Sequence, residues 1–132
     1  MATSPQTSLR SPLGRVRGLG SAKEGTHHWW AQRVTAVALI PITAWIVYSL
    51  LSLAGGDYID YLGWVRNPVN STLIILLVAV GFHHAQLGLQ VVIEDYVSGH
   101  ALRVVSVLAV KLLCAALAAL CIVSVLIVAF GG

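Results

Sequence analysis

Charged side chains are scarce in this chain of 132 residues. Asp, Glu, Lys and Arg together make up 10% of the sequence, whereas they make up about a quarter of a typical soluble domain. Hydrophobic residues account for 58%, and the mean hydropathy is +0.85. The chain therefore has too little polar surface to fold as a soluble enzyme, and its composition indicates an integral membrane protein.

Sequence patterns for catalysis are also missing. The two cysteines, Cys114 and Cys121, would lie about 10.5 Å apart along a helix axis, which is too far for a disulfide. The sequence has no zinc or iron–sulfur cysteine pattern, phosphate-binding loop, nucleophile triad or dinucleotide fingerprint, and nothing in it favours binding to nucleic acid. We predict no catalytic residue in this chain, so any chemistry belongs to a bound cofactor or to partner subunits.

Long apolar runs are what the sequence does contain. Three segments reach the length of about 20 mostly apolar residues that crossing a bilayer requires. They span residues 29–54, 69–97 and 102–130. We predict an all-α fold in which residues 26–132 form an integral membrane bundle of three transmembrane helices. Residues 55–67 are expected to form a loop, and residues 98–101 a short turn.

Basic residues set the predicted orientation of the bundle. Four of them precede the first apolar segment, namely Arg10, Arg15, Arg17 and Lys23. The loop after that segment contains one basic residue, Arg66. The positive-inside rule therefore places the N-terminus in the cytoplasm. Residues 1–25 are expected to form a mobile basic arm, although this Arg-rich start is also compatible with a mitochondrial transit peptide. The expected location is the bacterial inner membrane, with the mitochondrial inner membrane as the alternative.

One histidine lies about midway along the second apolar segment. An imidazole in lipid is costly, so a function is expected for His84. At about 100° per residue, Gly88, Val91 and Asp95 fall within roughly 40° of it on the helix. The missing side chain of Gly88 would let a flat macrocycle or another helix approach the backbone. Neutral imidazole in an apolar pocket suits haem iron, and an interhelical hydrogen bond is the alternative role.

His83 is the competing candidate ligand. It points about 100° away from its neighbour His84. A broader polar side of the same helix also carries Gln86, Gln90 and Glu94. Unpaired amides in hydrocarbon cost several kcal/mol, so this side is expected to face a partner helix.

Cations and a phenol gather near the predicted cytoplasmic surface. Arg33 lies roughly 6 Å inside its helix and His84 roughly 20 Å from the end of its own, which leaves room for a porphyrin edge with its propionates. Snorkelling of Arg33 to the interface is the alternative. Asp95 and Tyr96 end the second segment, where the acid can pair with Arg33 or Arg103. The phenol can donate a hydrogen bond to a quinone carbonyl.

Together these residues resemble the small membrane anchor subunit of succinate dehydrogenase. The motifs that carry the resemblance are His84-x3-Gly88-x6-Asp95-Tyr96 and, at the head of the first helix, His27-x5-Arg33-x-Thr35. The stretch from Gly18 to Arg33 is especially similar to alphaproteobacterial members. The resemblance covers about residues 12–130, and the two motifs are specific in combination. It favours His84 over His83 as the ligand.

The resemblance implies a role in respiratory complex II, the succinate:ubiquinone oxidoreductase that transfers electrons from succinate to quinone in the citric acid cycle and respiratory chain. It implies a cytochrome b556 anchor subunit, an iron–sulfur subunit and a flavoprotein subunit as partners. His84 would be one axial ligand of haem b, and the partner cytochrome subunit would supply the other. His27 and Arg33 would lie near the haem propionates, and Asp95 and Tyr96 beside the ubiquinone site.

Two other classes of function stay open at this point. A small transporter is one, although no acid lies deep within a predicted helix and no internal repeat is visible. A haem-free structural membrane anchor is the other, and in it His84 would only be hydrogen-bonded. The assignments of His27 and His84 rest on spacing, because His28 and His83 stand next to them.

Overall fold

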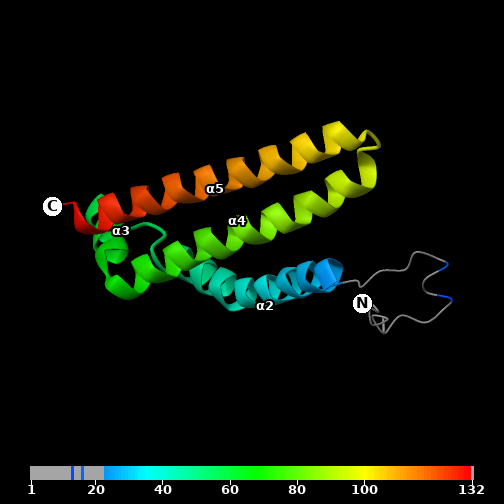
Figure 1. Cartoon of the computed structure of the whole chain (residues 1–132). Helices are drawn as coiled ribbons and strands as arrows, with labels where there is room; N and C mark the ends of the chain where they lie inside the picture. Colours follow the sequence, from blue (N-terminus) through cyan, green and yellow to red (C-terminus); the bar gives the residue numbers. More distant parts are fainter. Residues whose placement is uncertain (1–12, 14–15, 17–22, 132) are drawn as a thin grey trace, which may run out of the picture.

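The structure, a computed structural model, describes Leu13, Val16 and residues 23–131. The basic arm predicted over residues 1–25 lies almost entirely outside the described residues. All long elements of the described part are helices (Figure 1), which confirms the all-α prediction. They are α2 (Lys23–Ser52), α3 (Tyr58–Arg66), α4 (Pro68–Tyr96) and α5 (His100–Phe130).

Three of these helices are long and apolar enough to cross a membrane. The spans are 28, 29 and 31 residues long and cover Gly25–Ser52, Pro68–Tyr96 and His100–Phe130. A helix of about 29 residues is roughly 43 Å long and exceeds the hydrocarbon core of about 30 Å. The three predicted transmembrane segments are therefore confirmed, with boundaries that differ by a few residues, and the helix ends extend beyond the apolar layer.

Local sequence fixes where α4 and α5 begin. The Asn67 side chain caps α4 by accepting a hydrogen bond from the Val69 N–H at 2.9 Å, and Pro68 follows as the first helical residue, where its missing N–H costs nothing. At the other end of α4, the chain turns through three residues into α5. Arg103 Nε donates to the Val97 carbonyl at 2.9 Å across this turn, which ties the start of α5 to the end of α4.

A short helix, α3, forms where the sequence predicts a loop over residues 55–67. The Asp57 carboxylate accepts hydrogen bonds from the N–H groups of Ile59 and Asp60 at 2.9 and 3.0 Å. Asp60 in turn accepts from the Asp57 N–H at 3.0 Å, which completes a capping box. The prediction of a loop is therefore wrong: the segment is polar by composition, but its two spaced acids stabilise a helix start.

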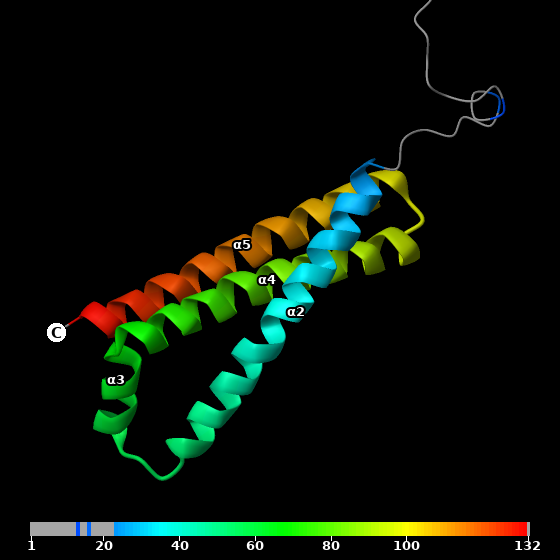
Figure 2. The same ribbon diagram turned by 90° about the horizontal axis from the view of Figure 1, so that it is seen from below.

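Helix α4 is the central element, with contacts to α2, α3 and α5. Figures 1 and 2 show α4 and α5 running antiparallel side by side. Figure 2 shows α2 crossing this pair at an angle, so that its C-terminal half lies apart from α4 and α3 spans the gap. The α2–α3 link includes a stack of Trp45 on Trp64 with ring centroids 5.5 Å apart. Arg66 of α3 donates to the Gly131 carbonyl at 2.6 Å, which ties α3 to the end of α5.

Few side chains of the described residues are buried. Leu87 and Cys114 are the buried apolar residues, and Ser49 and Ser71 are the buried polar ones. Most of the apolar surface of the three long helices is therefore open to lipid or to other chains.

Candidate functional site

A polar stripe runs along one side of the N-terminal half of α2. His28, Gln32 and Thr35 are spaced by four and three residues, which aligns side chains on one helix face. All three are half-buried, whereas His27 and Arg33 are exposed. The polar stripe faces α4, because both Gln32 and Thr35 contact His84.

His84 is half-buried between α4 and α2, with one strong and one weak contact. Its Nδ1 lies 2.9 Å from Thr35 Oγ1, and its Nε2 lies 3.5 Å from Gln32 Nε2. The first distance is that of a good hydrogen bond, and the second is at the outer limit. His84 thus makes an interhelical hydrogen bond to α2, and Nε2 is the less engaged ring nitrogen.

Gly88 lies one turn after His84 on the same side of α4. A Cβ atom added to Gly88 would lie 3.5 Å from Gln32 Nε2, an ordinary van der Waals contact. The sequence leaves open whether a flat cofactor or another helix approaches Gly88. Within the described residues, the end of the Gln32 side chain occupies this space.

Two polar atoms of the polar stripe are buried and lack a hydrogen-bond partner within the described residues. They are His28 Nε2 and Gln32 Oε1. Buried polar groups are normally paired, and an unpaired one costs about 1–3 kcal/mol. A face with unpaired polar atoms and an imidazole nitrogen in only weak contact has unused capacity for a ligand or a partner chain.

The adjacent His83 lies on the α5 side of α4. It is exposed, and it borders a cavity of about 180 Å³ between the two helices. The other lining residues are Ala79, Phe82, Gln86, Cys114, Ala115 and Ala118. This volume is below the range of about 300–1,000 Å³ typical of small-molecule sites. The sequence predicts that the polar side of α4 faces a partner helix. His83 and Gln86 of this side border α5 of the same chain.

The residues predicted to lie near the propionates and the quinone are exposed at one end of the bundle. Tyr96 is 85% exposed, and the guanidinium of Arg33 lies 5.3 Å from the ring centroid of Trp29. Figures 1 and 2 place the start of α2 and the end of α4 at the same end of the molecule. The structure brings no two of His27, Arg33, Asp95 and Tyr96 into a hydrogen bond or ion pair within its described residues.

Within the described residues, Asp95 forms no ion pair with either arginine that the sequence offers as its partner. Arg103 is held instead by the Val97 carbonyl at the end of α4. Arg33 is held by the Trp29 ring one turn before it, an arrangement that favours a guanidinium over an aromatic face. Asp95 therefore keeps its carboxylate exposed at the surface.

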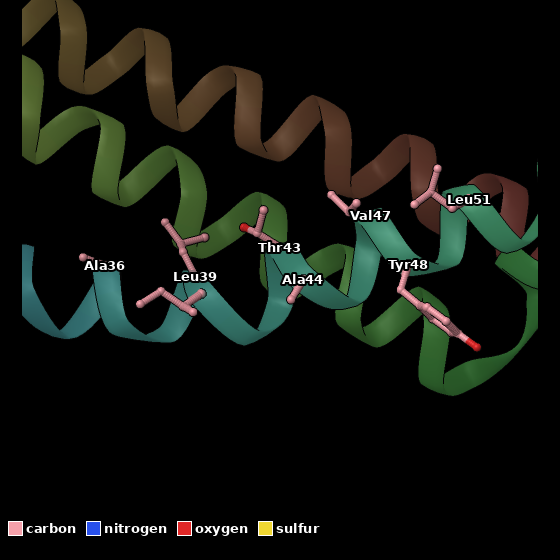
Figure 3. A pocket seen from close by; sticks show the side chains of 8 residues that line it. Ala36, Leu39, Thr43, Ala44, Val47, Tyr48 and Leu51 are labelled. Carbon is pink, nitrogen blue, oxygen red and sulfur yellow. The ribbon is translucent and has the colours of Figure 1, made fainter.

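A second hollow follows α2 beyond the polar stripe. It is an open groove of about 690 Å³, and Figure 3 shows the side chains that border it. The lining residues are Ala36, Leu39, Ile40, Thr43, Ala44, Val47, Tyr48 and Leu51. The groove is mostly apolar and does not include His84, so the candidate chemistry lies at the polar stripe and not in the larger hollow.

Thr35 and Gln32 are the contacts of His84 that the sequence prediction missed. Thr35 enters that prediction only as part of a motif, and Gln32 has no role in it. The signal available in the sequence is the spacing of His28, Gln32 and Thr35, which places three polar side chains on one face of an apolar helix.

Comparison with known proteins gives a consistent set of relatives. The family model described as succinate dehydrogenase/fumarate reductase transmembrane subunit matches residues 7–128. The succinate dehydrogenase hydrophobic membrane anchor subunit of Rickettsia bellii is 38% identical over 104 residues, which is 79% of this chain and 83% of the relative. The subunit of the same name from Paracoccus denitrificans is 35% identical over 89 residues, 67% of this chain and 69% of the relative.

Proposed function

The chain belongs to the succinate dehydrogenase/fumarate reductase transmembrane subunit family, and from this premise we propose that it holds one side of a haem b and forms part of a ubiquinone site in respiratory complex II. The family and its anchor-subunit relatives make it a membrane anchor subunit of succinate dehydrogenase. This assignment confirms the family resemblance found in the sequence. The haem, the quinone site and their residues are the proposal.

The observation that supports haem ligation is the state of the His84 ring. Haem iron takes neutral imidazole, and a metal-ligating histidine almost always donates its other ring N–H to a partner. His84 has such a partner in Thr35 at 2.9 Å, and its Nε2 is in only weak contact with Gln32 at 3.5 Å. The donor set therefore fits an axial haem ligand. Bound haem would supply a one-electron redox centre with no proton chemistry of its own.

The remaining haem contacts are assigned to α2 and to the partner cytochrome subunit. Gly88 presents no side chain one turn from His84, so a flat group would lie close to α4 once the end of the Gln32 side chain turned away from this space. His27 and Arg33 are exposed, and their positive charges suit propionates supplied from outside the chain. The cytochrome b556 anchor subunit would provide the second axial histidine, so the chain contributes half of the ligand set.

The quinone site is assigned to the end of α4. The Tyr96 phenol is 85% exposed and can donate its O–H to a quinone carbonyl, while the neighbouring Asp95 carboxylate is exposed and unpaired by either nearby arginine. Other parts of this site would come from the partner anchor and the iron–sulfur subunit. Oxidation of succinate belongs to the flavoprotein subunit, because we find no residues for dehydrogenase chemistry in this sequence.

The proposed setting is the bacterial inner membrane, with the N-terminus of the chain in the cytoplasm. The three membrane-spanning helices make the chain an integral membrane protein. With this orientation, Tyr96 and Asp95 lie at the cytoplasmic surface, where the soluble subunits that deliver electrons would dock.

A reduced-minus-oxidised spectrum of the purified complex tests the haem assignment. We expect a b-type signal that succinate reduces, a loss of at least about tenfold in that signal for His84→Leu, and near wild-type intensity for His83→Leu. Loss of one metal ligand removes several kcal/mol of binding, and about 1.4 kcal/mol corresponds to tenfold. The reverse result for the two variants would transfer the ligand role to His83.

A haem-free structural anchor is the second candidate function. The observation that favours it is that His84 already forms a hydrogen bond between α2 and α4, which is enough to explain an intramembrane histidine. A complex that assembles, oxidises succinate and shows no b-type signal would establish this function instead.

A further inference from the structure

Thr35 contacts both its own helix and α4. Its Oγ1 lies 2.8 Å from the Ala31 carbonyl oxygen and 3.1 Å from that of Gln32. The same oxygen lies 2.9 Å from His84 Nδ1. A threonine bonded to the carbonyl one turn back is a common arrangement within helices, and it holds the side chain in one rotamer.

The hydrogen count of Thr35 decides what it offers to His84. A hydroxyl has one hydrogen and two acceptor lone pairs. With the hydrogen donated to a backbone carbonyl of α2, the oxygen can only accept from His84, so Nδ1 must carry a proton. Neutral imidazole has one N–H, and Nε2 is then the nitrogen with the free lone pair.

The opposite ring state would cost interactions on both helices. If Nε2 carried the proton, the lone pair of Nδ1 would face the Thr35 oxygen, and the hydroxyl would have to give up the Ala31 carbonyl in order to donate to the ring. The Nε2 proton would then face the Gln32 amide nitrogen at 3.5 Å, which is also a donor, unless that amide turned to present its oxygen. Thr35 therefore fixes both the tautomer and the orientation of His84.

We infer that Thr35 is a positioning residue for the proposed haem ligand: it presents Nε2 of His84 for ligation, and through the Nδ1 hydrogen bond it stabilises the oxidised haem relative to the reduced haem. This inference rests on the proposed function. The physical reason is that an N–H donated to an acceptor makes the imidazole more electron-rich, and an electron-rich ligand favours the higher oxidation state of the metal.

Three variants of Thr35 separate the hydrogen bond from the packing of the side chain. Thr35→Val keeps the shape and removes the oxygen, Thr35→Ser keeps the oxygen and removes a methyl group, and Thr35→Ala removes the oxygen without added apolar bulk. Thr43→Val is the matched control, because Thr43 is an exposed residue of the same helix that borders the apolar groove and does not contact His84.

The experiment is a redox titration of the haem in the purified complex, together with its haem content and the low-temperature electron paramagnetic resonance spectrum of its oxidised form. In Thr35→Val we expect the reduction equilibrium to shift about threefold to tenfold toward reduced haem, because a neutral hydrogen bond contributes about 0.5–1.5 kcal/mol. For a one-electron couple this is a rise of about 30–60 mV in midpoint potential. We expect Thr35→Ala to shift the same way and Thr35→Ser and Thr43→Val to stay near wild type.

The outcomes decide between a positioning role and a merely structural one. Loss of haem from Thr35→Val with retention in Thr35→Ser also supports the inference, since only the oxygen distinguishes the two results. A midpoint potential unchanged in both Thr35→Val and Thr35→Ala, or an equal change in Thr35→Ser or Thr43→Val, would overturn it. Failure of the proposed function has a different signature: the wild-type complex would lack a b-type signal, or His84→Leu would retain it.

Discussion

The two sides of α4 that contact its long neighbours differ in chemistry and in geometry. Toward α5, the two helices run side by side in both views (Figures 1 and 2), with Cys114 buried and alanines at the contact. Toward α2, the helices cross at an angle, and the contact is made by His84 with Gln32 and Thr35. One side is a long contact that includes the buried Cys114 and several alanines, and the other is a crossing contact that includes three polar side chains.

The difference shows two ways of joining helices in a bilayer. Helix association in lipid has no hydrophobic driving force, so it depends on close packing of small residues and on interhelical hydrogen bonds. The α5 side of α4 uses the first, and the α2 side uses the second. Among the described residues, the α2 side also has two buried polar atoms without a hydrogen-bond partner. We therefore read the α5 side as a scaffold and the α2 side as the side where a cofactor or partner completes the structure.

The strongest test of the difference between the two sides of α4 is to add the same side chain at two of its glycines. A Cβ on Gly88 would already lie 3.5 Å from Gln32, whereas a Cβ on Gly81 would meet nothing within 4 Å. Gly88→Leu should push the N-terminal half of α2 away from α4, because overpacking a helix contact costs about 1–3 kcal/mol. We expect the b-type haem signal per complex to fall about tenfold or more.

Gly81→Leu is the matched control on the same helix. Gly81 borders an open hollow of about 270 Å³, and we expect the haem signal of the variant to stay within about twofold of wild type, because an added Cβ meets nothing within 4 Å. An equal loss in both variants would show that α4 is uniformly sensitive and that its two sides do not differ as described.

A second test asks whether quinone chemistry depends on either side of α4 or only on its end. Tyr96→Phe removes one O–H and should lower succinate-driven quinone reduction about fivefold to tenfold, the equivalent of about 1–1.5 kcal/mol for one hydrogen bond. The haem content should not change. Tyr58→Phe, at an exposed tyrosine of α3, should leave quinone reduction at the wild-type rate. A loss of haem in Tyr96→Phe would contradict the separation of the two sites.

The smallest effect is expected on the α5 side. Cys114→Ala removes a buried sulfur from the α4–α5 contact and should destabilise the complex by about 1 kcal/mol, typical of a single substitution. A thermal melt of the purified complex should show a lower midpoint, with an unchanged haem spectrum. Cys121→Ala, at the half-buried cysteine, is the control and should melt closer to wild type. A shifted haem spectrum in Cys114→Ala would mean that the α5 side also determines the site.

The sequence predicts the three long helices well, because hydropathy and length are properties of each segment by itself. It does not predict α3, since the hydropathy of residues 55–67 indicates a loop and the capping box depends on two individual carboxylates. The stripe of His84 and Gly88 follows from helical periodicity within α4. The contact of that stripe with Thr35 depends on how α2 crosses α4, which neither helix specifies alone.

The contacts of Arg33 and Arg103 also depend on details that charge alone does not specify. Asp95, Arg33 and Arg103 lie near one end of the bundle, so charge alone favours a pair. In the structure each arginine has another partner. Arg103 donates to the Val97 carbonyl at the end of α4, and Arg33 lies over the Trp29 ring of its own helix.

Helix α2 is held to its neighbours differently from α5. Helix α5 is tied at one end by Arg103 and at the other by Arg66. Helix α2 is joined to α3 through a turn in which Gly55 has a φ of 92°, and the stack of Trp45 on Trp64 lies near this turn. The turn and the stack form a pivot in the C-terminal half of α2 and beyond it, whereas Thr35 lies in its N-terminal half. A small rotation about this pivot would displace the far end of α2 the most, so a bulky group can enter beside His84 by tilting one helix while α3, α4 and α5 keep their packing.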